Sequence, residues 1–417
     1  MKLRTSVPCL SLMFILGATP LELGCSSGPD VSETGGASTG GQPGGGSSQS
    51  SGGSPALGGS AALGGSGGGV AVGGNISSGG SEAGGSPNPS GGTPGASGGA
   101  TGGEPAGGSA SGGGGPAPVF ACPEGASELA PVLGEAIKVL DPPPNPPDIS
   151  GSTFFLEGPV YTNGKLYFSQ FRDYAEQGQP SPGRIMAFDG QTAVEVAADT
   201  GTNGLALAGP GLLYGASQKV GGLVSIDLST SPAAVATLIA DYMGTRLNSP
   251  NDLTIGPDGT VYFSDPDWNC AAPCSQPETR VYRYPASGER KLIEIPTDHA
   301  KPNGVALSPD SKTLYIGGDA SLVSLPVMED GSVGAAIPFG SLSGVDGMGV
   351  DCAGNLYTAV GGDITVLSPT GSLLGTITVA GDTTNVAFGG PGSTTLYITT
   401  LREGIFALDV KIPGFPY

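Results

Sequence analysis

The chain has 417 residues, 77 of them glycine, and carries a formal net charge of −20 at neutral pH. This charge disfavours binding to nucleic acid, because like charges repel, and it favours binding of a cation. We therefore expect no nucleic-acid partner.

Residues 1–24 have the pattern of an export signal. Lys2 and Arg4 precede an apolar run over residues 7–18, and Gly24-Cys25-Ser26-Ser27 follows. The pattern resembles a bacterial lipoprotein signal, in which the cysteine carries lipid. We expect an exported protein, anchored to a bacterial membrane through Cys25 and facing the periplasm or the cell surface. If Cys25 carries no lipid, the alternative is a secreted protein.

Residues 25–117 are almost entirely Gly, Ser, Ala, Pro and Thr. Such a segment has too little apolar surface to offset the entropy lost on ordering, so we expect a disordered tether. Residues 118–417 have the composition of a globular domain, long enough for a sizeable core. We expect this domain to be a monomer that contacts the membrane only through the N-terminal lipid.

Four cysteines remain in the domain, an even number that favours disulfides in an oxidising compartment. Cys270 and Cys274 are close enough to close a small loop, which leaves Cys122 to pair with Cys352. A zinc site is a weaker interpretation, because no histidine accompanies these cysteines.

A repeat runs through the domain. Six times a turn is followed by Leu or Val and then Tyr in a short β-like run, with a spacing of 40 to 53 residues. The six tyrosines are Tyr167, Tyr214, Tyr262, Tyr315, Tyr357 and Tyr397. Units of this length, built only from short strands, suit one four-stranded propeller blade. The sequence therefore predicts an all-β fold, a six-bladed β-propeller.

Ten to twelve residues before each tyrosine lies a side chain that carries oxygen. These residues are Glu157, Asn203, Asn251, Asn303, Asp346 and Asn385. Each precedes the predicted innermost strand of its blade, so we expect the six to form a ring around one mouth of the central channel. Asn-Gly and Asn-Asp are common in turns, and a turn is the alternative interpretation of any single position.

A ring of carboxylate and amide oxygens, without thiol or imidazole, suits a hard divalent cation. Ca²⁺ fits best, and Mg²⁺, Mn²⁺ or Zn²⁺ are alternatives. Two carboxylates would balance its charge.

The same segments resemble the family of gluconolactonases, senescence marker protein and luciferin-regenerating enzyme. The resemblance runs from about residue 154 to the C-terminus, and its most specific motifs cover residues 246–252, 258–266 and 301–310. It implies a six-bladed propeller with one catalytic divalent cation. Animal members carry an arginine two residues before the position of Asn251, where this chain has Ser249.

By motif, the resemblance implies that Glu157, Asn251, Asn303 and Asp346 surround the metal and that Asp346 is also the general base. For Asn251 the alternative is a contact on the substrate side. Asn203, Asn385, Trp268 and His299 are the residues that we expect on the substrate side. For His299 a solvated position in a loop is the alternative interpretation. His299 is the only histidine of the chain. We therefore expect no catalytic triad of Ser, His and Asp.

The favoured hypothesis is hydrolysis of a small sugar lactone, with the metal as Lewis acid. One alternative is hydrolysis of a phosphotriester or another ester at the same site. The other is a non-catalytic, metal-stabilised propeller that binds a ligand at the cell surface.

Overall fold

The computed structural model describes residues 122–145, 154–172, 183–270, 273–297 and 301–415. The predicted signal peptide and tether lie outside these ranges and stay predictions. Within the described ranges, no helix is long and apolar enough to cross a membrane.

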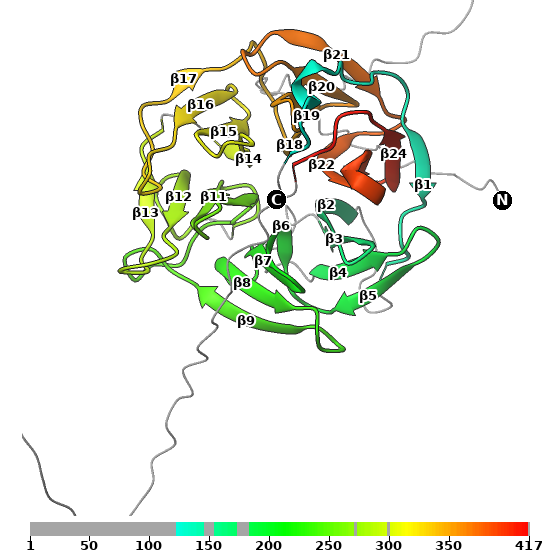
Figure 1. Cartoon of the computed structure of the whole chain (residues 1–417). Helices are drawn as coiled ribbons and strands as arrows, with labels where there is room; N and C mark the ends of the chain where they lie inside the picture. Colours follow the sequence, from blue (N-terminus) through cyan, green and yellow to red (C-terminus); the bar gives the residue numbers. More distant parts are fainter. Residues whose placement is uncertain (1–121, 146–153, 173–182, 271–272, 298–300, 416–417) are drawn as a thin grey trace, which may run out of the picture. The chain divides into compact units, whose positions relative to one another are not determined.

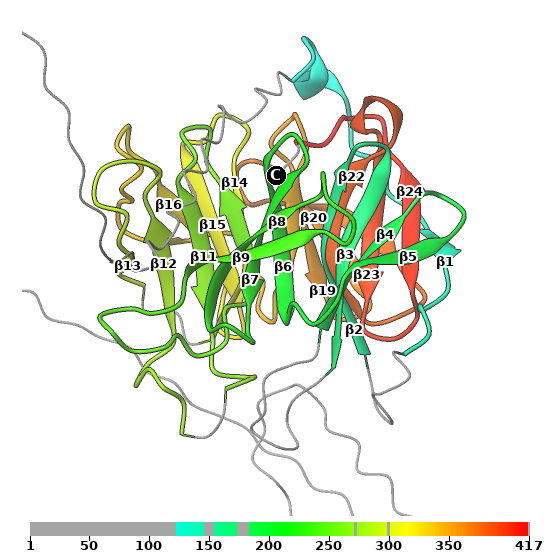
Figure 2. The ribbon, with the colours of Figure 1, turned by 90° about the horizontal axis from the view of Figure 1, so that it is seen from below.

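The described residues form six four-stranded antiparallel sheets arranged around one axis as the blades of a propeller (Figures 1 and 2). In blades 1 to 3 the strands are β2 (Phe154–Thr162), β3 (Lys165–Arg172), β4 (Gly183–Phe188) and β5 (Ala193–Ala197); β6 (Thr202–Gly209), β7 (Leu212–Ser217), β8 (Gly222–Asp227) and β9 (Ala234–Ile239); and β10 (Leu253–Ile255), β11 (Val261–Asp265), β12 (Arg280–Tyr284) and β13 (Ile293–Ile295). In blades 4 to 6 they are β14 (Pro302–Leu307), β15 (Thr313–Gly318), β16 (Val323–Pro326) and β17 (Ile337–Pro338); β18 (Met348–Val350), β19 (Leu356–Val360), β20 (Asp363–Leu367) and β21 (Leu373–Thr378); and β22 (Thr383–Gly389), β23 (Thr395–Thr400), β24 (Ile405–Asp409) and β1 (Ile137–Leu140). Two short 3₁₀ helices, η1 (Ala126–Glu128) and η2 (Pro391–Ser393), complete the described elements.

The predicted six-bladed propeller is confirmed, and the repeat has a structural cause. Each repeated tyrosine lies in the second strand of its blade, and Tyr262, Tyr315 and Tyr357 are almost fully buried. Apolar side chains of neighbouring blades form six hydrophobic clusters, one at each of the six junctions between blades. Because every junction needs a large side chain at the same place, the tyrosine recurs once per blade.

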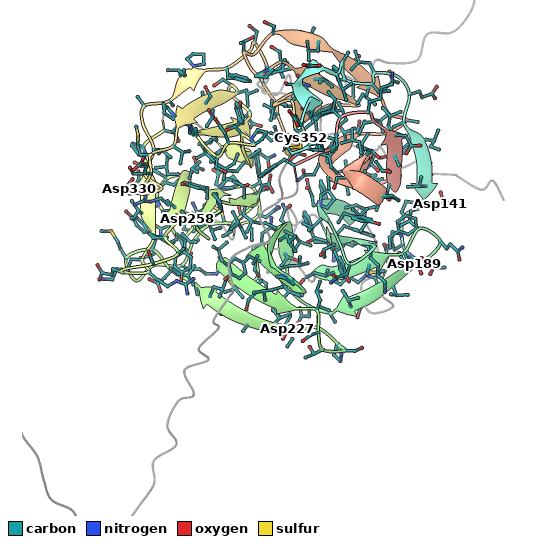
Figure 3. The ribbon with its side chains drawn as sticks, viewed as in Figure 1. Asp141, Asp189, Asp227, Asp258, Asp330 and Cys352 are labelled. Atoms are coloured by element: carbon teal, nitrogen blue, oxygen red, sulfur yellow. A yellow bond between two sulfur atoms is a disulfide. The ribbon has the colours of Figure 1, made fainter. Side chains whose placement is uncertain are left out.

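Four aspartates lie at turns between strands. Asp189, Asp227, Asp258 and Asp330 each accept a hydrogen bond from a backbone N–H group two residues later. They lie away from the axis of the propeller (Figure 3). These aspartates stabilise turns, so their charge is not available to the central channel.

Blade 6 is assembled from both ends of the domain. Strand β1 pairs antiparallel with β24 and forms the outermost strand of the sheet that contains β22 and β23. Hydrogen bonds between residues far apart in sequence therefore close the ring of blades.

The C-terminal segment crosses from blade 6 to the inner end of blade 5. The Phe415 N–H group donates to the Val350 carbonyl at 2.8 Å, and the Cys352 N–H group donates to the Pro413 carbonyl at 2.8 Å. Cys352 also forms a disulfide with Cys122, and Cys270 pairs with Cys274, which confirms both predicted disulfides.

The Cys122–Cys352 disulfide joins residues 230 positions apart. We expect the Cys122→Ser/Cys352→Ser double variant to lose about 2–5 kcal/mol of unfolding free energy, because the crosslink restricts the unfolded chain across a long loop. Cys270→Ser/Cys274→Ser is the matched control, and its shorter loop should make the loss smaller. Urea unfolding of both variants measures the difference, and an equal loss in the two would contradict the prediction.

Candidate active site

The six predicted ring residues lie at the same end of the inner strands. Glu157, Asn203, Asn303 and Asn385 lie in β2, β6, β14 and β22, each beside a shift in strand register. Asn251 and Asp346 come two residues before β10 and β18. Such β-bulges re-aim side chains and are over-represented near active sites. The Asn-Gly pairs in β6 and β14 are therefore strand residues and not turns.

Contacts between neighbouring blades connect the ring. The Gly204 N–H group donates to the Asn251 carbonyl at 2.6 Å, and the Gly347 N–H group donates to the Thr384 carbonyl at 2.7 Å. Two contacts join side chains: Asn303 Nδ2 donates to Asp346 Oδ1 at 2.6 Å, and Asn385 Nδ2 donates to Glu157 Oε2 at 3.1 Å.

Four of the six ring residues are followed by glycine, and the close approach of the next blade explains why. A Cβ atom on Gly158 would lie 2.5 Å from the Asn203 carbonyl oxygen, and one on Gly304 would lie 2.1 Å from the Asp346 carbonyl oxygen. A Cβ atom on Gly204 would lie 2.7 Å from the Asn251 carbonyl oxygen, and one on Gly347 would overlap the Asn385 side chain. Larger residues at these positions would push the blades apart and widen the ring.

The carboxyl groups of the ring have strongly perturbed acidity. Burial raises the pKa of Glu157 well above its usual range, and the neighbouring Asp346 and Asp252 raise it further. Burial also raises the pKa of Asp346 to about 8, although the hydrogen bond from Asn303 opposes this shift. Both shifts have the same cause, the cost of negative charge in a poorly solvated place. A bound cation would offset that cost.

Asp252 is a third carboxylate at the ring, and the sequence analysis did not select it. Its side chain is 6% exposed and accepts hydrogen bonds from the Leu253 N–H group at 2.9 Å and the Val305 N–H group at 3.1 Å. Burial raises its pKa to about 7. One signal was present in the sequence: aspartate follows Asn251, at the position where four other repeats have glycine.

These shifts predict how stability depends on pH without a cation. The pKa values of Asp252 and Asp346 are raised to about 7 and about 8. In the unfolded chain both groups titrate near 4, so between about pH 4 and pH 8 the folded protein binds more protons. Stability must therefore fall as pH rises through this window. In EDTA, we expect the melting temperature to be several degrees lower at pH 8 than at pH 5.

Differential scanning calorimetry at the two pH values, with EDTA and with excess CaCl₂, measures the effect. Calcium should raise the melting temperature chiefly at pH 8, where the carboxyl groups must ionise. A melting temperature in EDTA that rises from pH 5 to pH 8 would contradict the assignment of buried, uncompensated carboxyl groups.

The donor set fits a hard cation. Asn203 Oδ1 and Asn303 Oδ1 are buried without a hydrogen-bond partner, which is costly for an amide oxygen unless something else binds it. Within the described ranges, no group of three or more His, Cys, Asp and Glu residues lies close enough to hold a metal by itself. An ion here would therefore need the amide oxygens as well as the carboxylates, as Ca²⁺ sites commonly do.

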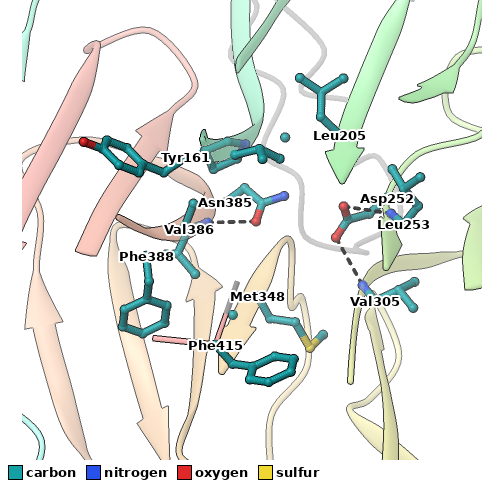
Figure 4. Close-up of a pocket in the computed structure, with 15 residues that line it drawn as sticks. Tyr161, Leu205, Asp252, Leu253, Val305, Met348, Asn385, Val386, Phe388 and Phe415 are labelled. Atoms are coloured by element: carbon teal, nitrogen blue, oxygen red, sulfur yellow. Dashed lines mark hydrogen bonds between the residues drawn. The ribbon is translucent and has the colours of Figure 1, made fainter. Parts of the chain in front are cut away.

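A small cavity lies in the channel beneath the ring. Its volume is about 40 Å³, which is room for about three water molecules at roughly 10–15 Å³ each. Asp252 and Asn385 line its polar end, while Leu205, Met348 and Phe415 are among its apolar lining residues (Figure 4). Since Phe415 is held against the far end of β18, the C-terminal segment borders the channel opposite the ring.

The loop after β11 lies at the same end of blade 3 as Asn251, because β10 and β11 are antiparallel. It contains Trp268, which is half-buried, and the Cys270–Cys274 disulfide. Ser249, at the position of the arginine in animal relatives, is fully buried, and its hydroxyl donates to the Pro266 carbonyl at 2.7 Å. Its side chain therefore supports the loop. His299 lies outside the described residues.

The structure thus brings the six ring residues together and places Trp268 at the same end of the propeller. Their roles as metal ligands, general base or substrate contacts stay predictions.

Comparisons with known proteins find related sequences and structures. The chain is 30% identical to a gluconolactonase of Zymomonas mobilis over 220 residues, which cover 47% of this chain and 60% of the relative. A gluconolactonase structure from Xanthomonas campestris is 28% identical, with a TM-score of 0.53 over 62% of this chain and 86% of that one. The calcium-binding protein regucalcin from Agrobacterium tumefaciens, at 22% identity, shares the fold with a TM-score of 0.53 over 69% of this chain and 98% of its own.

The match to the Zymomonas relative spans less than two thirds of that protein's length. The family model described as the SMP-30/Gluconolactonase/LRE-like region, however, matches residues 156–402, which include all six ring residues. This chain belongs to the SMP-30/gluconolactonase/LRE-like family.

Proposed function

We propose that the chain is a metal-dependent hydrolase of a sugar lactone or a related cyclic ester. The observation that carries the proposal is the ring itself, where buried carboxyl groups with raised pKa values stand beside unpartnered amide oxygens. Family membership and the two similar gluconolactonases support a lactone as substrate.

Glu157, Asn251, Asn303 and Asp346 would hold the cation, most favourably Ca²⁺. When bound, it would polarise the lactone carbonyl as a Lewis acid. Asp346 would accept the proton of the attacking water, as a general base. Asn303 holds the Asp346 carboxylate at 2.6 Å, and Asn385 holds Glu157 in the same way. Both carboxylates are thus oriented before substrate arrives, which lowers the reorganisation needed for reaction.

A panel of sugar lactones, aryl esters and a phosphotriester, assayed before and after removal of divalent ions with EDTA, tests the proposal. We expect lactone hydrolysis that is lost on chelation and restored by Ca²⁺, Mg²⁺, Mn²⁺ or Zn²⁺, since the carbonyl loses its electrophilic partner without the ion.

Full activity in a metal-free preparation would refute the mechanism. Faster turnover of the phosphotriester or an aryl ester would assign a different substrate to the same site. Cation binding without hydrolysis of any compound would favour a non-catalytic binding propeller.

A further inference from the structure

The Asp252 carboxylate touches parts of the propeller that belong to different blades. Asp252 itself is in blade 3, immediately before β10. Its Oδ2 atom accepts a hydrogen bond from the Val305 N–H group of blade 4 at 3.1 Å. Its Oδ1 atom packs against Gly204 of blade 2 so closely that a Cβ atom on Gly204 would lie 2.7 Å from it. The amide nitrogen of Asn385, in blade 6, points toward the same carboxylate (Figure 4).

Two of these contacts lead directly to predicted metal ligands. Val305 follows Asn303 by two residues, and the register shift of β14 lies between Pro302 and Val305. The hydrogen bond from Val305 to Asp252 therefore fixes the backbone that carries Asn303. Asn385 donates to Glu157 Oε2 at 3.1 Å and accepts from the Val386 N–H group at 2.8 Å, which orients its amide plane.

We propose that Asp252 is a positioning residue that sets the spacing of Asn303 and Glu157 for the cation, through the Val305 backbone and the Asn385 amide. The inference rests on the proposed metal-dependent function of the same ring. Asp252 need not bind the cation for this role, because it would orient the ligands Asn303 and Glu157 through Val305 and Asn385. Residues that orient metal ligands in this way commonly change metal affinity by about 10- to 100-fold.

The test is calorimetric titration of CaCl₂ into the full chain after EDTA treatment, with no substrate present. Asp252→Asn keeps the size of the side chain but replaces one acceptor oxygen with a donor. We expect it to weaken calcium binding by about 10- to 100-fold. Asp351→Asn is the matched control, because Asp351 is also a buried aspartate. It accepts several hydrogen bonds, from Ala353, Asn355 and Tyr357, in a turn at the end of blade 5 away from the ring.

Thermal unfolding of the cation-free variants separates positioning from a general loss of stability. Asp351→Asn should melt lower but gain as much stability from calcium as the wild type, whereas Asp252→Asn should gain less on addition of calcium. Asn385→Leu cuts the second link without touching Asp252. It should also weaken calcium binding. The double variant should lose less than the sum of the single effects, since Asp252→Asn already disturbs the link through Asn385.

Calcium affinity of Asp252→Asn equal to that of the wild type would overturn this inference and leave the proposed function intact. An equal loss in Asp252→Asn and Asp351→Asn would also overturn it, because the effect would then be structural. A wild-type chain that binds no Ca²⁺, Mg²⁺, Mn²⁺ or Zn²⁺ would overturn the proposed function, and the inference with it.

Discussion

Asp346→Asn should lower lactone turnover by about 10²- to 10⁴-fold, the range that removal of a general base typically costs. Asparagine keeps the size of the side chain and one oxygen, so it can still contribute a ligand to the ring. It cannot accept the proton of water at neutral pH, and it removes the one carboxylate that Asn303 holds at 2.6 Å. Turnover should therefore fall much further than metal affinity.

Glu157→Gln is the contrasting variant, because Glu157 is assigned only a ligand role. It should chiefly weaken the cation, and saturating calcium should restore a large part of its activity. Asp319→Asn controls for the loss of a negative charge near Asp346, since Asp319 is exposed and raises the pKa of Asp346 through its charge. The measurement is the metal content of each variant set against its lactonase rate. If Asp346→Asn and Glu157→Gln lose activity equally at saturating calcium, the base assignment is wrong.

Gly304→Ala should destabilise the domain by about 3 kcal/mol or more, at the upper end of what overpacking a close-packed site costs. The new Cβ atom would lie 2.1 Å from the Asp346 carbonyl oxygen, which is backbone and cannot rotate away. Blades 4 and 5 would have to separate, and the Asn303–Asp346 hydrogen bond would be lost with them. The variant should therefore also bind calcium more weakly.

Gly209→Ala is the matched control, because Gly209 ends the inner strand β6 and a Cβ atom there would meet nothing within 4 Å. Alanine restricts the unfolded chain more than glycine does, so this variant should be neutral or stabilised by up to about 1 kcal/mol. Urea unfolding of both variants, followed by Trp268 fluorescence and circular dichroism, gives the comparison. Equal stability of Gly304→Ala and Gly209→Ala would show that the ring tolerates a wider spacing.

The repeat, and the position of the ring residue within each repeat, could be predicted from the sequence because both are local patterns. A tyrosine must fill each junction between blades, so it recurs once per blade, as at Tyr262 and Tyr315. The oxygen-bearing residue lies ten to twelve residues before it along the chain, because a similar short hairpin separates the two. The pairing of Cys122 with Cys352 followed from the number of cysteines once Cys270 and Cys274 were paired.

Contacts between blades could be found only in the tertiary structure, since they join residues that no local pattern relates. Strand β1 closes the last blade by pairing with β24, almost at the other end of the chain. Gly304 is required because another blade's backbone meets it, and not because of its own conformation. Asp252 belongs to an Asn-Asp pair, which is common in turns, yet its carboxylate accepts a hydrogen bond from the Val305 N–H group of the next blade. The sequence by itself determined where along each repeat the six oxygen-bearing residues recur, because that pattern is local; how closely six separate blades approach one another at the axis depends on packing across the whole ring.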